Sequence, residues 1–143
     1  YSAILKNVYA IGAGIASGLG YGDNFQAVFV SNAIREMELF LDAVFPETRD
    51  VNESAYLGDL LVTAYSLFSR NRNLGNLIGK GYTVKSAVQS MSMVAEGYYA
   101  TRGIYEIAYE KKLKTPIINA IFSVLYEGKD AEKQFEKLTA KLN

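Results

Sequence analysis

The sequence predicts an all-α domain of about eight helices, and three features support this fold class. Apolar residues recur every three to four positions along most of the 143 residues, which is the period of an amphipathic helix. Only two prolines occur, and the sustained alternation followed by hairpin turns that marks paired strands is missing. Half of the residues are hydrophobic and 21% are charged, so the chain can bury one core.

The first two expected helices occupy residues 2–20 and 23–44, and each carries one apolar stripe. The stripes contain Ile4, Val8, Ile11, Ile15 and Leu19, then Phe25, Phe29, Ala33, Met37, Leu41 and Val44. Pro46 closes the second helix, because proline cannot continue the helical hydrogen bonds. A third helix is expected over about 53–67, with its leucines turned inward.

Residues that favour helix ends divide the rest of the chain. Side chains that can cap a helix start are Ser69, Thr83, Thr115 and Asp130. Thr115 is followed by Pro116, and proline is favoured at the first helical position. Glycine can end a helix in the left-handed conformation, and we expect ends at Gly79 or Gly81 and at Gly128. A sixth helix spans roughly 96–112, and the last one follows Asp130.

The segment Gly12-Ala13-Gly14-Ile15-Ala16-Ser17-Gly18 resembles a dinucleotide-binding glycine loop. That loop must follow a strand and open a helix, whereas this segment lies in the middle of a helical pattern. The same glycines could pair two membrane helices, but the apolar run over about 8–22 is shorter than the roughly 20 residues that a span requires. We therefore expect these small residues to let two helices of the domain approach closely, with no membrane partner.

The composition narrows the possible chemistry. Lys plus Arg equal Asp plus Glu at 15 each, which argues against nucleic acid as the main partner. The sequence has no Cys and no His, so the usual ligands of zinc and iron–sulfur sites and the Ser-His and Cys-His nucleophile pairs are missing. We expect no metal site, and acid–base chemistry falls to Lys, Asp, Glu or Tyr. The chain begins at Tyr1 in structured-looking sequence, which we interpret as a fragment without a signal peptide.

Two candidate site residues lie on polar or small-residue faces of expected helices. Lys6 shares its side of the first helix with small side chains, opposite the apolar stripe, which is typical of a cleft or a close helix contact. The alternative is a solvated lysine near a helix end. Asp59 shares a face with Asn52, Thr63 and Ser66, and the alternative there is a solvated polar face.

The segment Ser69-Arg70-Asn71-Arg72 places two arginines in a first helical turn, where the helix dipole favours acidic residues. If Ser69 caps the helix, the next N–H groups stay free. A bound phosphate would satisfy these N–H groups and both arginines. The alternative is that the arginines pair with carboxylates such as Glu47 or Asp50.

The segment Val94-Ala95-Glu96-Gly97 lies at a junction between two expected helices. Glu96 could accept hydrogen bonds from ribose hydroxyls or amides at this junction. The alternative is an acidic residue that only favours the start of a helix, where the dipole is positive.

Together these segments resemble the bacterial NAD(P)-dependent glycerol-3-phosphate dehydrogenases. The matches keep the family's order and spacing from Lys6 to Lys129, and five motifs in register are far more specific than any one. They are Leu5-Lys6-Asn7-Val8, Leu57-Gly58-Asp59-Leu60, Ser69-Arg70-Asn71-Arg72, Val94-Ala95-Glu96-Gly97 and Leu125-Tyr126-Glu127-Gly128-Lys129. The resemblance implies a substrate-binding C-terminal domain over 1–143, folded like that of the 6-phosphogluconate dehydrogenase-like enzymes, with the dinucleotide-binding domain absent.

The resemblance also implies residue roles. Lys6 matches the lysine that accepts the proton in the oxidation direction, and Asp59 matches the aspartate that contacts the substrate beside it, so these two form the catalytic pair. Substrate contacts are implied at Lys6, Asp59, Ser69, Arg70 and Asn71. Cofactor contacts are implied at Arg70, Val94 and Glu96.

Three positions depart from the family pattern. Tyr56 stands where glycine is usual, Ala95 replaces a common valine, and Tyr99 stands where arginine is common, with Arg102 the nearest arginine. The last two departures affect the edge of the site that would face the cofactor.

The reaction implied by the resemblance interconverts dihydroxyacetone phosphate and sn-glycerol 3-phosphate with NAD or NADP, in the cytoplasm, and feeds glycerophospholipid synthesis. A homodimer is the family expectation, and the isolated fragment is expected to be inactive. Two alternatives stay open. One is a related two-domain hydroxy-acid dehydrogenase, for which a phosphate site at 69–72 would fit less well. The other is a non-enzymatic helical interaction module, which would leave two arginines at a helix start unexplained.

Overall fold

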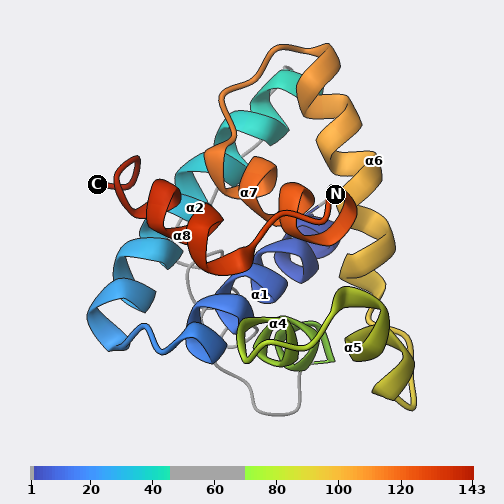
Figure 1. The fold of residues 1–143 in the computed structure, drawn as a ribbon. Helices are drawn as coiled ribbons and strands as arrows, with labels where there is room; N and C mark the ends of the chain where they lie inside the picture. The colour runs from blue at the N-terminus through green and yellow to red at the C-terminus, as the bar shows by residue number, and fades with distance from the viewer. Residues whose placement is uncertain (1, 46–69) are drawn as a thin grey trace.

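The computed structural model describes residues 2–45 and 70–143, and every regular element in these ranges is an α-helix. The helices are α1 (Ser2–Leu19), α2 (Asp23–Val44), α4 (Arg70–Gly79), α5 (Val84–Ser90), α6 (Glu96–Glu110), α7 (Pro116–Tyr126) and α8 (Ala131–Thr139) (Figure 1). The predicted all-α fold is confirmed for the described part of the chain. The helix expected over 53–67 lies outside the described residues.

The helix ends follow the predicted caps with two differences. Thr83 Oγ1 accepts a hydrogen bond from Ser86 N at 3.0 Å, and Asp130 caps α8 in the same way. Thr115 precedes α7 as expected, but its hydroxyl contacts Asn119 Oδ1 at 3.2 Å and caps no N–H group. The sixth helix ends two residues earlier than predicted, because Lys112 adopts a left-handed φ of 55° that stops the helix.

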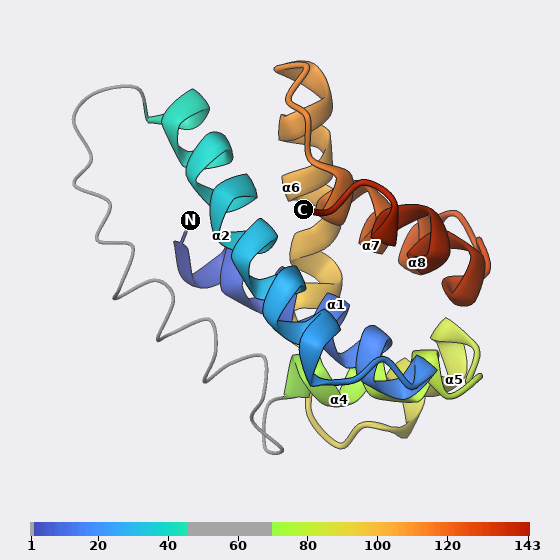
Figure 2. The same cartoon turned by 90° about the vertical axis from the view of Figure 1, so that its left-hand side faces the viewer.

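Helix α1 lies at the centre of the described molecule and packs against α2, α4, α6 and α7 (Figures 1 and 2). It is therefore buried on more than its predicted apolar stripe: Ala10 and Ala13, on the predicted small-residue side, are fully buried as well. The prediction that Ile4 belongs to the buried stripe is wrong. Ile4 is 42% exposed and Leu5 is fully buried instead.

Glycines make the contact between α1 and α4. A Cβ atom on Gly14 would lie 2.1 Å from the Arg72 carbonyl oxygen, and one on Gly75 would lie 2.1 Å from the Ile11 carbonyl oxygen. Gly18 and Gly79 repeat this arrangement one turn later. The two backbones thus touch directly, which confirms that the glycines serve helix approach and not a nucleotide loop. In the described ranges, moreover, every helix is too short or too polar to cross a bilayer.

A buried carboxylate connects α1, α2 and α7. Glu36 of α2 is only 5% exposed. Its Oε1 accepts a hydrogen bond from Ile117 N at 2.8 Å, and its Oε2 accepts one from Ile118 N at 3.0 Å and one from the Tyr9 hydroxyl at 2.9 Å. Glu36 therefore binds the free N–H groups at the start of α7 in place of Thr115. Desolvation by burial raises the pKa of Glu36 to about 7, although these three hydrogen bonds oppose the rise.

Stacked rings hold α6 against α7. Tyr105 and Phe122 are almost parallel, with ring centroids 3.8 Å apart, and Phe122 also stacks on Tyr126 at 5.4 Å. Tyr126 continues the row to Tyr98, at 5.1 Å, close to the start of α6. These contacts fix the direction of α6, so that its first turn reaches α1 and α4.

Candidate functional site

The first turns of α4 and α6 meet the first half of α1 at one junction. The Gly97 N–H of α6 donates a hydrogen bond to Asn71 Oδ1 of α4 at 2.8 Å. A Cβ atom on Gly97 would lie 2.7 Å from the Asn7 carbonyl oxygen of α1. We call the residues Asn7, Asn71 and Gly97 the three-helix junction. Three predicted site residues are their sequence neighbours, so the fold brings Lys6, Arg70 and Glu96 to the same region.

Lys6 lies on α1, one residue before the junction, and its side chain is partly buried. Its place beside a close contact between helices agrees with the expectation drawn from the small residues around it. A partly buried ammonium is less hydrated than a free one and is therefore better able to act on a bound oxygen. The catalytic role of Lys6 stays a prediction.

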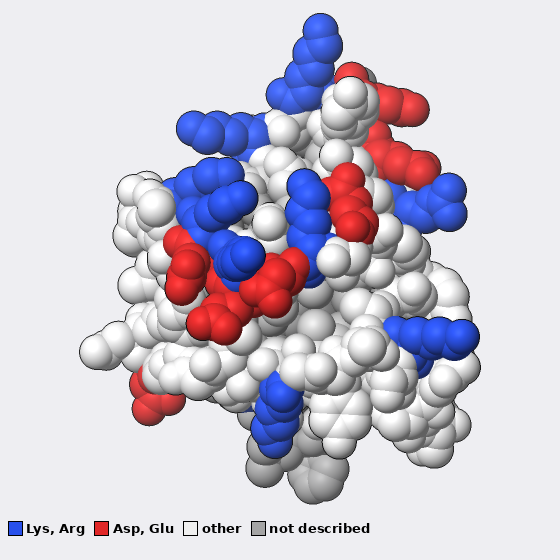
Figure 3. All heavy atoms as spheres, in the orientation of Figure 1, with Lys and Arg blue, Asp and Glu red and all other residues white. Residues whose placement is uncertain are grey.

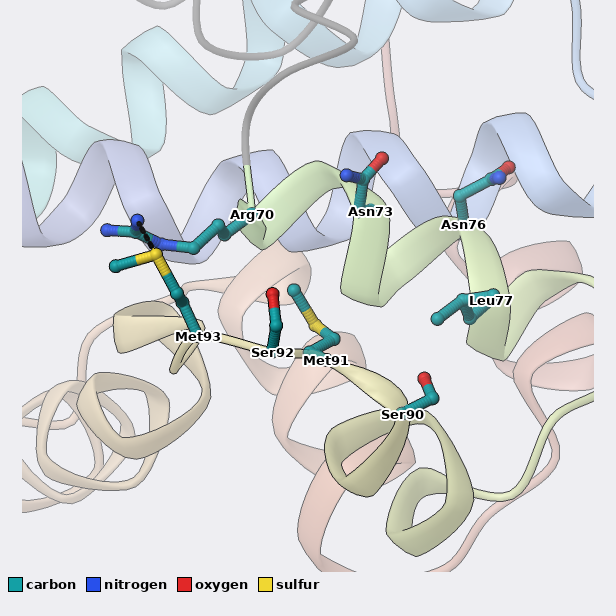
Figure 4. Close-up of a pocket in the computed structure, with 8 residues that line it drawn as sticks. All are labelled: Arg70, Asn73, Asn76, Leu77, Ser90, Met91, Ser92 and Met93. Atoms are coloured by element: carbon teal, nitrogen blue, oxygen red, sulfur yellow. Dashed lines mark hydrogen bonds between the residues drawn. The ribbon is translucent and has the colours of Figure 1, made fainter.

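Arg70 is the first residue of α4, and its side chain is exposed. It reaches across to the segment before α6, where Nη1 donates to Met93 Sδ at 3.5 Å (Figure 4). Beside it lies a hollow of about 560 Å³ between α4 and residues 90–93. Its lining, shown in Figure 4, consists of Arg70, Asn73, Asn76, Leu77, Ser90, Met91, Ser92 and Met93. One guanidinium with amides and hydroxyls around it suits an anionic, oxygen-rich ligand.

Sequence reasoning missed the amides and hydroxyls of this hollow. Asn73 and Asn76 are three positions apart and so share a face of α4, which is a signal that could have found them. Ser90 and Ser92 carry no comparable signal, because Ser90 ends the short helix α5, Ser92 follows it, and only the fold places them opposite α4.

The other predicted substrate contacts are placed only in part. Asp59 and Ser69 lie outside the described residues. Asn71 is buried, and the oxygen of its amide group is engaged by Gly97. A ligand that contacts Asn71 would therefore find the amide nitrogen, which is a donor and suits a phosphate or hydroxyl oxygen.

The predicted cofactor edge lies at the start of α6. Val94 is 59% exposed and Glu96, the first residue of the helix, is exposed as well. Val94 borders a small apolar hollow of about 110 Å³ that Leu74, Met91 and Tyr98 also line. An exposed carboxylate beside an apolar hollow can accept hydrogen bonds from ribose hydroxyls while a flat ring contacts the apolar wall.

The departures from the family pattern are visible at this edge. Tyr99 is exposed and packs edge-on against Tyr98, with ring centroids 5.0 Å apart. Arg102, the nearest arginine, pairs with Glu106 on its own helix at 3.3 Å. Arg102 therefore contacts its neighbour one turn on, and Tyr99 presents an aromatic surface where the resemblance led us to expect an arginine.

The charge distribution is mixed over the face seen in Figure 3, where Lys and Arg side chains lie among Asp and Glu side chains. Within residues 2–45 and 70–143, no group of three or more His, Cys, Asp or Glu side chains could hold a metal ion. In the described residues, a ligand near the junction would therefore meet single polar side chains and not a cluster of metal ligands.

The fold and the junction define an all-helical domain in which the basic start of α4 and the acidic start of α6 meet α1, the helix that carries Lys6. Residues 1–136 match the family described as NAD-dependent glycerol-3-phosphate dehydrogenase C-terminus. The chain belongs to this family of C-terminal domains.

Named relatives agree with this assignment. The chain is 38% identical over 138 residues to the glycerol-3-phosphate dehydrogenase [NAD(P)+] of Bacillus pumilus, covering 96% of this chain and 40% of the relative. It is 39% identical over 134 residues to the enzyme of the same name from Syntrophomonas wolfei, covering 94% and 39%. The crystal structure of glycerol-3-phosphate dehydrogenase from Coxiella burnetii superimposes with a TM-score of 0.89 at 28% identity, covering 96% of this chain and 42% of that one. The chain thus spans about two-fifths of the length of these relatives.

Proposed function

We propose that this chain is the substrate-binding C-terminal domain of an enzyme that interconverts dihydroxyacetone phosphate and sn-glycerol 3-phosphate with NAD(P)(H). The observation that supports the proposal is the three-helix junction, whose residues Asn7, Asn71 and Gly97 directly follow Lys6, Arg70 and Glu96, in a chain of this family. The dinucleotide-binding domain of such an enzyme would lie outside residues 1–143. The alternative of another hydroxy-acid substrate fits a phosphate site at 69–72 less well, and a plain interaction module would not explain the two arginines at the start of α4.

The exposed basic start of α4 would hold the phosphate. Arg70 supplies a guanidinium, and the first N–H groups of the helix and the helix dipole favour the same anion. The Asn71 amide nitrogen would add a polar contact, and so would Ser69, which is outside the described residues. Because the phosphate lies away from the reacting carbon, its binding energy would fix that carbon in place for the reaction.

Lys6 would carry the proton. During reduction the carbonyl oxygen of dihydroxyacetone phosphate gains negative charge, which a Lys6 ammonium would stabilise before donating its proton. In the oxidation direction neutral Lys6 would take the proton from the hydroxyl. Asp59, outside the described residues, would orient Lys6 or the substrate hydroxyl.

The nicotinamide of NAD(P) supplies the hydride when the cofactor is bound. The start of α6 fits one edge of that cofactor, because exposed Val94 and Glu96 offer an apolar contact and a hydrogen-bond acceptor side by side. Arg70, whose guanidinium reaches Met93 beside Val94, would contact the cofactor as well. By family resemblance we extend the proposal to a cytoplasmic homodimer that supplies glycerophospholipid synthesis.

The test is NAD(P)H oxidation with dihydroxyacetone phosphate by the full-length enzyme that contains this chain, comparing wild type with Lys6→Ala. Loss of a general acid–base group typically lowers the rate by about 10²–10⁴-fold, and we expect Lys6→Ala to fall in or beyond that range. Residues 1–143 alone should show no turnover. Near-normal activity of Lys6→Ala would remove the proposed role of Lys6. Turnover only with carboxylate-bearing keto acids would replace the proposed substrate.

A further inference from the structure

Gly97 lies where α6 touches both α1 and α4, and the space around it admits no side chain. A Cβ atom there would lie 2.7 Å from the Asn7 carbonyl oxygen and 2.7 Å from Asn71 Oδ1. Real Cβ atoms essentially never approach other heavy atoms so closely. Because Asn7 would meet the methyl group with its backbone, a methyl group on Gly97 has to move α6 relative to α1.

Both polar groups of the Gly97 backbone are bound by side chains. The N–H donates to Asn71 Oδ1 at 2.8 Å, and the carbonyl oxygen accepts from Thr101 Oγ1 at 2.6 Å. Thr101 is fully buried and Asn71 is nearly so. Buried hydrogen bonds of this kind are costly to break, since the groups left behind lack water. The first turn of α6 is therefore fixed in position as well as closely packed.

None of these residues needs a ligand to make its contact, yet each is adjacent to a residue with a proposed ligand role. Asn7 follows Lys6, Asn71 follows Arg70, and Gly97 follows Glu96. The Arg70 contact with Met93 links α4 to the same segment a second time. We propose that Gly97, held by Asn71 and Thr101, is a positioning residue that sets the place of the cofactor edge relative to Lys6 and the phosphate site. This inference rests on the proposed function.

The consequence concerns how two ligands are placed relative to each other. Hydride transfer needs the two reacting carbons in near contact, and a misplacement of about 1 Å can cost roughly 10²-fold in rate. A displaced α6 would still present Glu96 to the cofactor, with Val94 in the segment before it, and α4 would still present Arg70 to the phosphate. Disturbing the junction should therefore lower kcat much more than it weakens either ligand alone.

The experiment compares Gly97→Ala with Gly103→Ala in the full-length enzyme. The two substitutions are chemically identical and lie on the same helix, but a Cβ atom on Gly103 meets nothing within 4 Å. For Gly97→Ala we expect kcat to fall about 10- to 100-fold, with the KM for dihydroxyacetone phosphate and the Kd for NAD(P)H each changed less than about three-fold. Gly103→Ala should keep kcat within about two-fold of wild type.

Thr101 provides a milder pair of variants in case Gly97→Ala fails to fold. Thr101→Val removes the hydrogen bond to the Gly97 carbonyl and keeps the shape, whereas Thr101→Ser keeps the hydroxyl. We expect Thr101→Val to lower kcat several-fold without a matching rise in KM or Kd, and Thr101→Ser to restore most of it. Selective loss with rescue would support positioning, because a merely structural role would not separate kcat from binding.

Other outcomes overturn the inference in distinguishable ways. A Gly97→Ala enzyme that melts earlier but keeps its kcat well below the melting temperature would make Gly97 only structural. A raised KM or Kd with unchanged kcat would make the junction a simple binding contact. If Gly97→Ala does not fold, a Thr101→Val enzyme with the kcat of the wild type would likewise show that Gly97 is only structural. A wild-type enzyme without turnover would instead refute the proposed function, and the inference with it.

Discussion

Helices α4 and α6 carry the two edges of the candidate site, and beyond the first turn of α6, which meets α1 at Gly97, they are attached to the rest of the domain by different means. Helix α4 lies on α1 with backbone against backbone, at Gly14 and Gly75, where no side chain fits. Helix α6 lies on α7 through large side chains, with Tyr105 stacked on Phe122. A backbone contact has no part that can rotate away, whereas rings can shift and repack. We therefore expect α4 to be more rigid in position and less tolerant of substitution than the part of α6 that lies beyond Gly97.

The substitution that tests this difference most strongly is Gly14→Ala, which should give the largest loss of stability. The added methyl would lie 2.1 Å from the Arg72 carbonyl oxygen, so α1 and α4 must separate. We expect the free energy of unfolding to fall by about 4 kcal/mol, at the upper end of overpacking effects. Chemical denaturation measures it, with Gly103→Ala as control, expected to stabilise by roughly 0.5–1 kcal/mol because alanine favours helix. Equal stability of the two variants would show that α4 can move freely.

A third contact, at Glu36, sharpens the comparison because its strength depends on pH. Burial raises the pKa of Glu36 to about 7 in the folded chain, above the usual 4.5. The folded state therefore binds this proton more tightly, so the associated stability is complete below about pH 4.5 and is lost as pH rises through about 7. At roughly 1.4 kcal/mol per pH unit, the loss amounts to about 3 kcal/mol.

The variant that checks this dependence is Glu36→Gln, which has nearly the same shape and does not titrate. The free energies of unfolding of wild type and variant are measured from pH 4 to 8. The two values should converge or cross as the pH rises, because only the wild type loses the stability that protonated Glu36 contributes. Tyr9, whose pKa is raised well above 10 mainly by burial and also by Glu36, stays neutral in this range. Parallel pH profiles for the two proteins would mean that the pKa of Glu36 is the same in the folded and the unfolded chain.

The smallest expected effect belongs to the ring contact between α6 and α7. Phe122→Ala removes the central ring of the row formed with Tyr105 and Tyr126. Because Phe122 is only partly buried, we expect a loss of about 2 kcal/mol, below the range for fully buried aromatic residues. Phe122→Leu should lose about half as much, since it refills part of the space. A loss from Phe122→Ala larger than that from Gly14→Ala would reverse the proposed order of rigidity.

Local signals predicted much of the fold and the outline of the site. The period of the apolar residues predicted both ends of α1 and α2 to within one residue. Thr83 and Asp130 correctly indicated the starts of the helices that they cap. The motifs around Lys6, Arg70 and Glu96 indicated the family before any contact was known. Each of these signals depends on the side chains of residues that are close together in the sequence, so the sequence carries it without knowledge of the fold.

Only the tertiary structure decided which of these residues meet. Glu36 looked like one more polar residue on α2, yet it binds the start of α7, 81 residues away in sequence, and displaces Thr115 from that role. Gly97 looked like the end of a motif, yet it lets α6 reach Asn7 and Asn71. The physical reason is that helices form through preferences of residues close together in the sequence. The distance between two helices depends instead on contacts between residues far apart in the sequence, such as a glycine that lets two backbones touch or a side chain that binds the start of another helix.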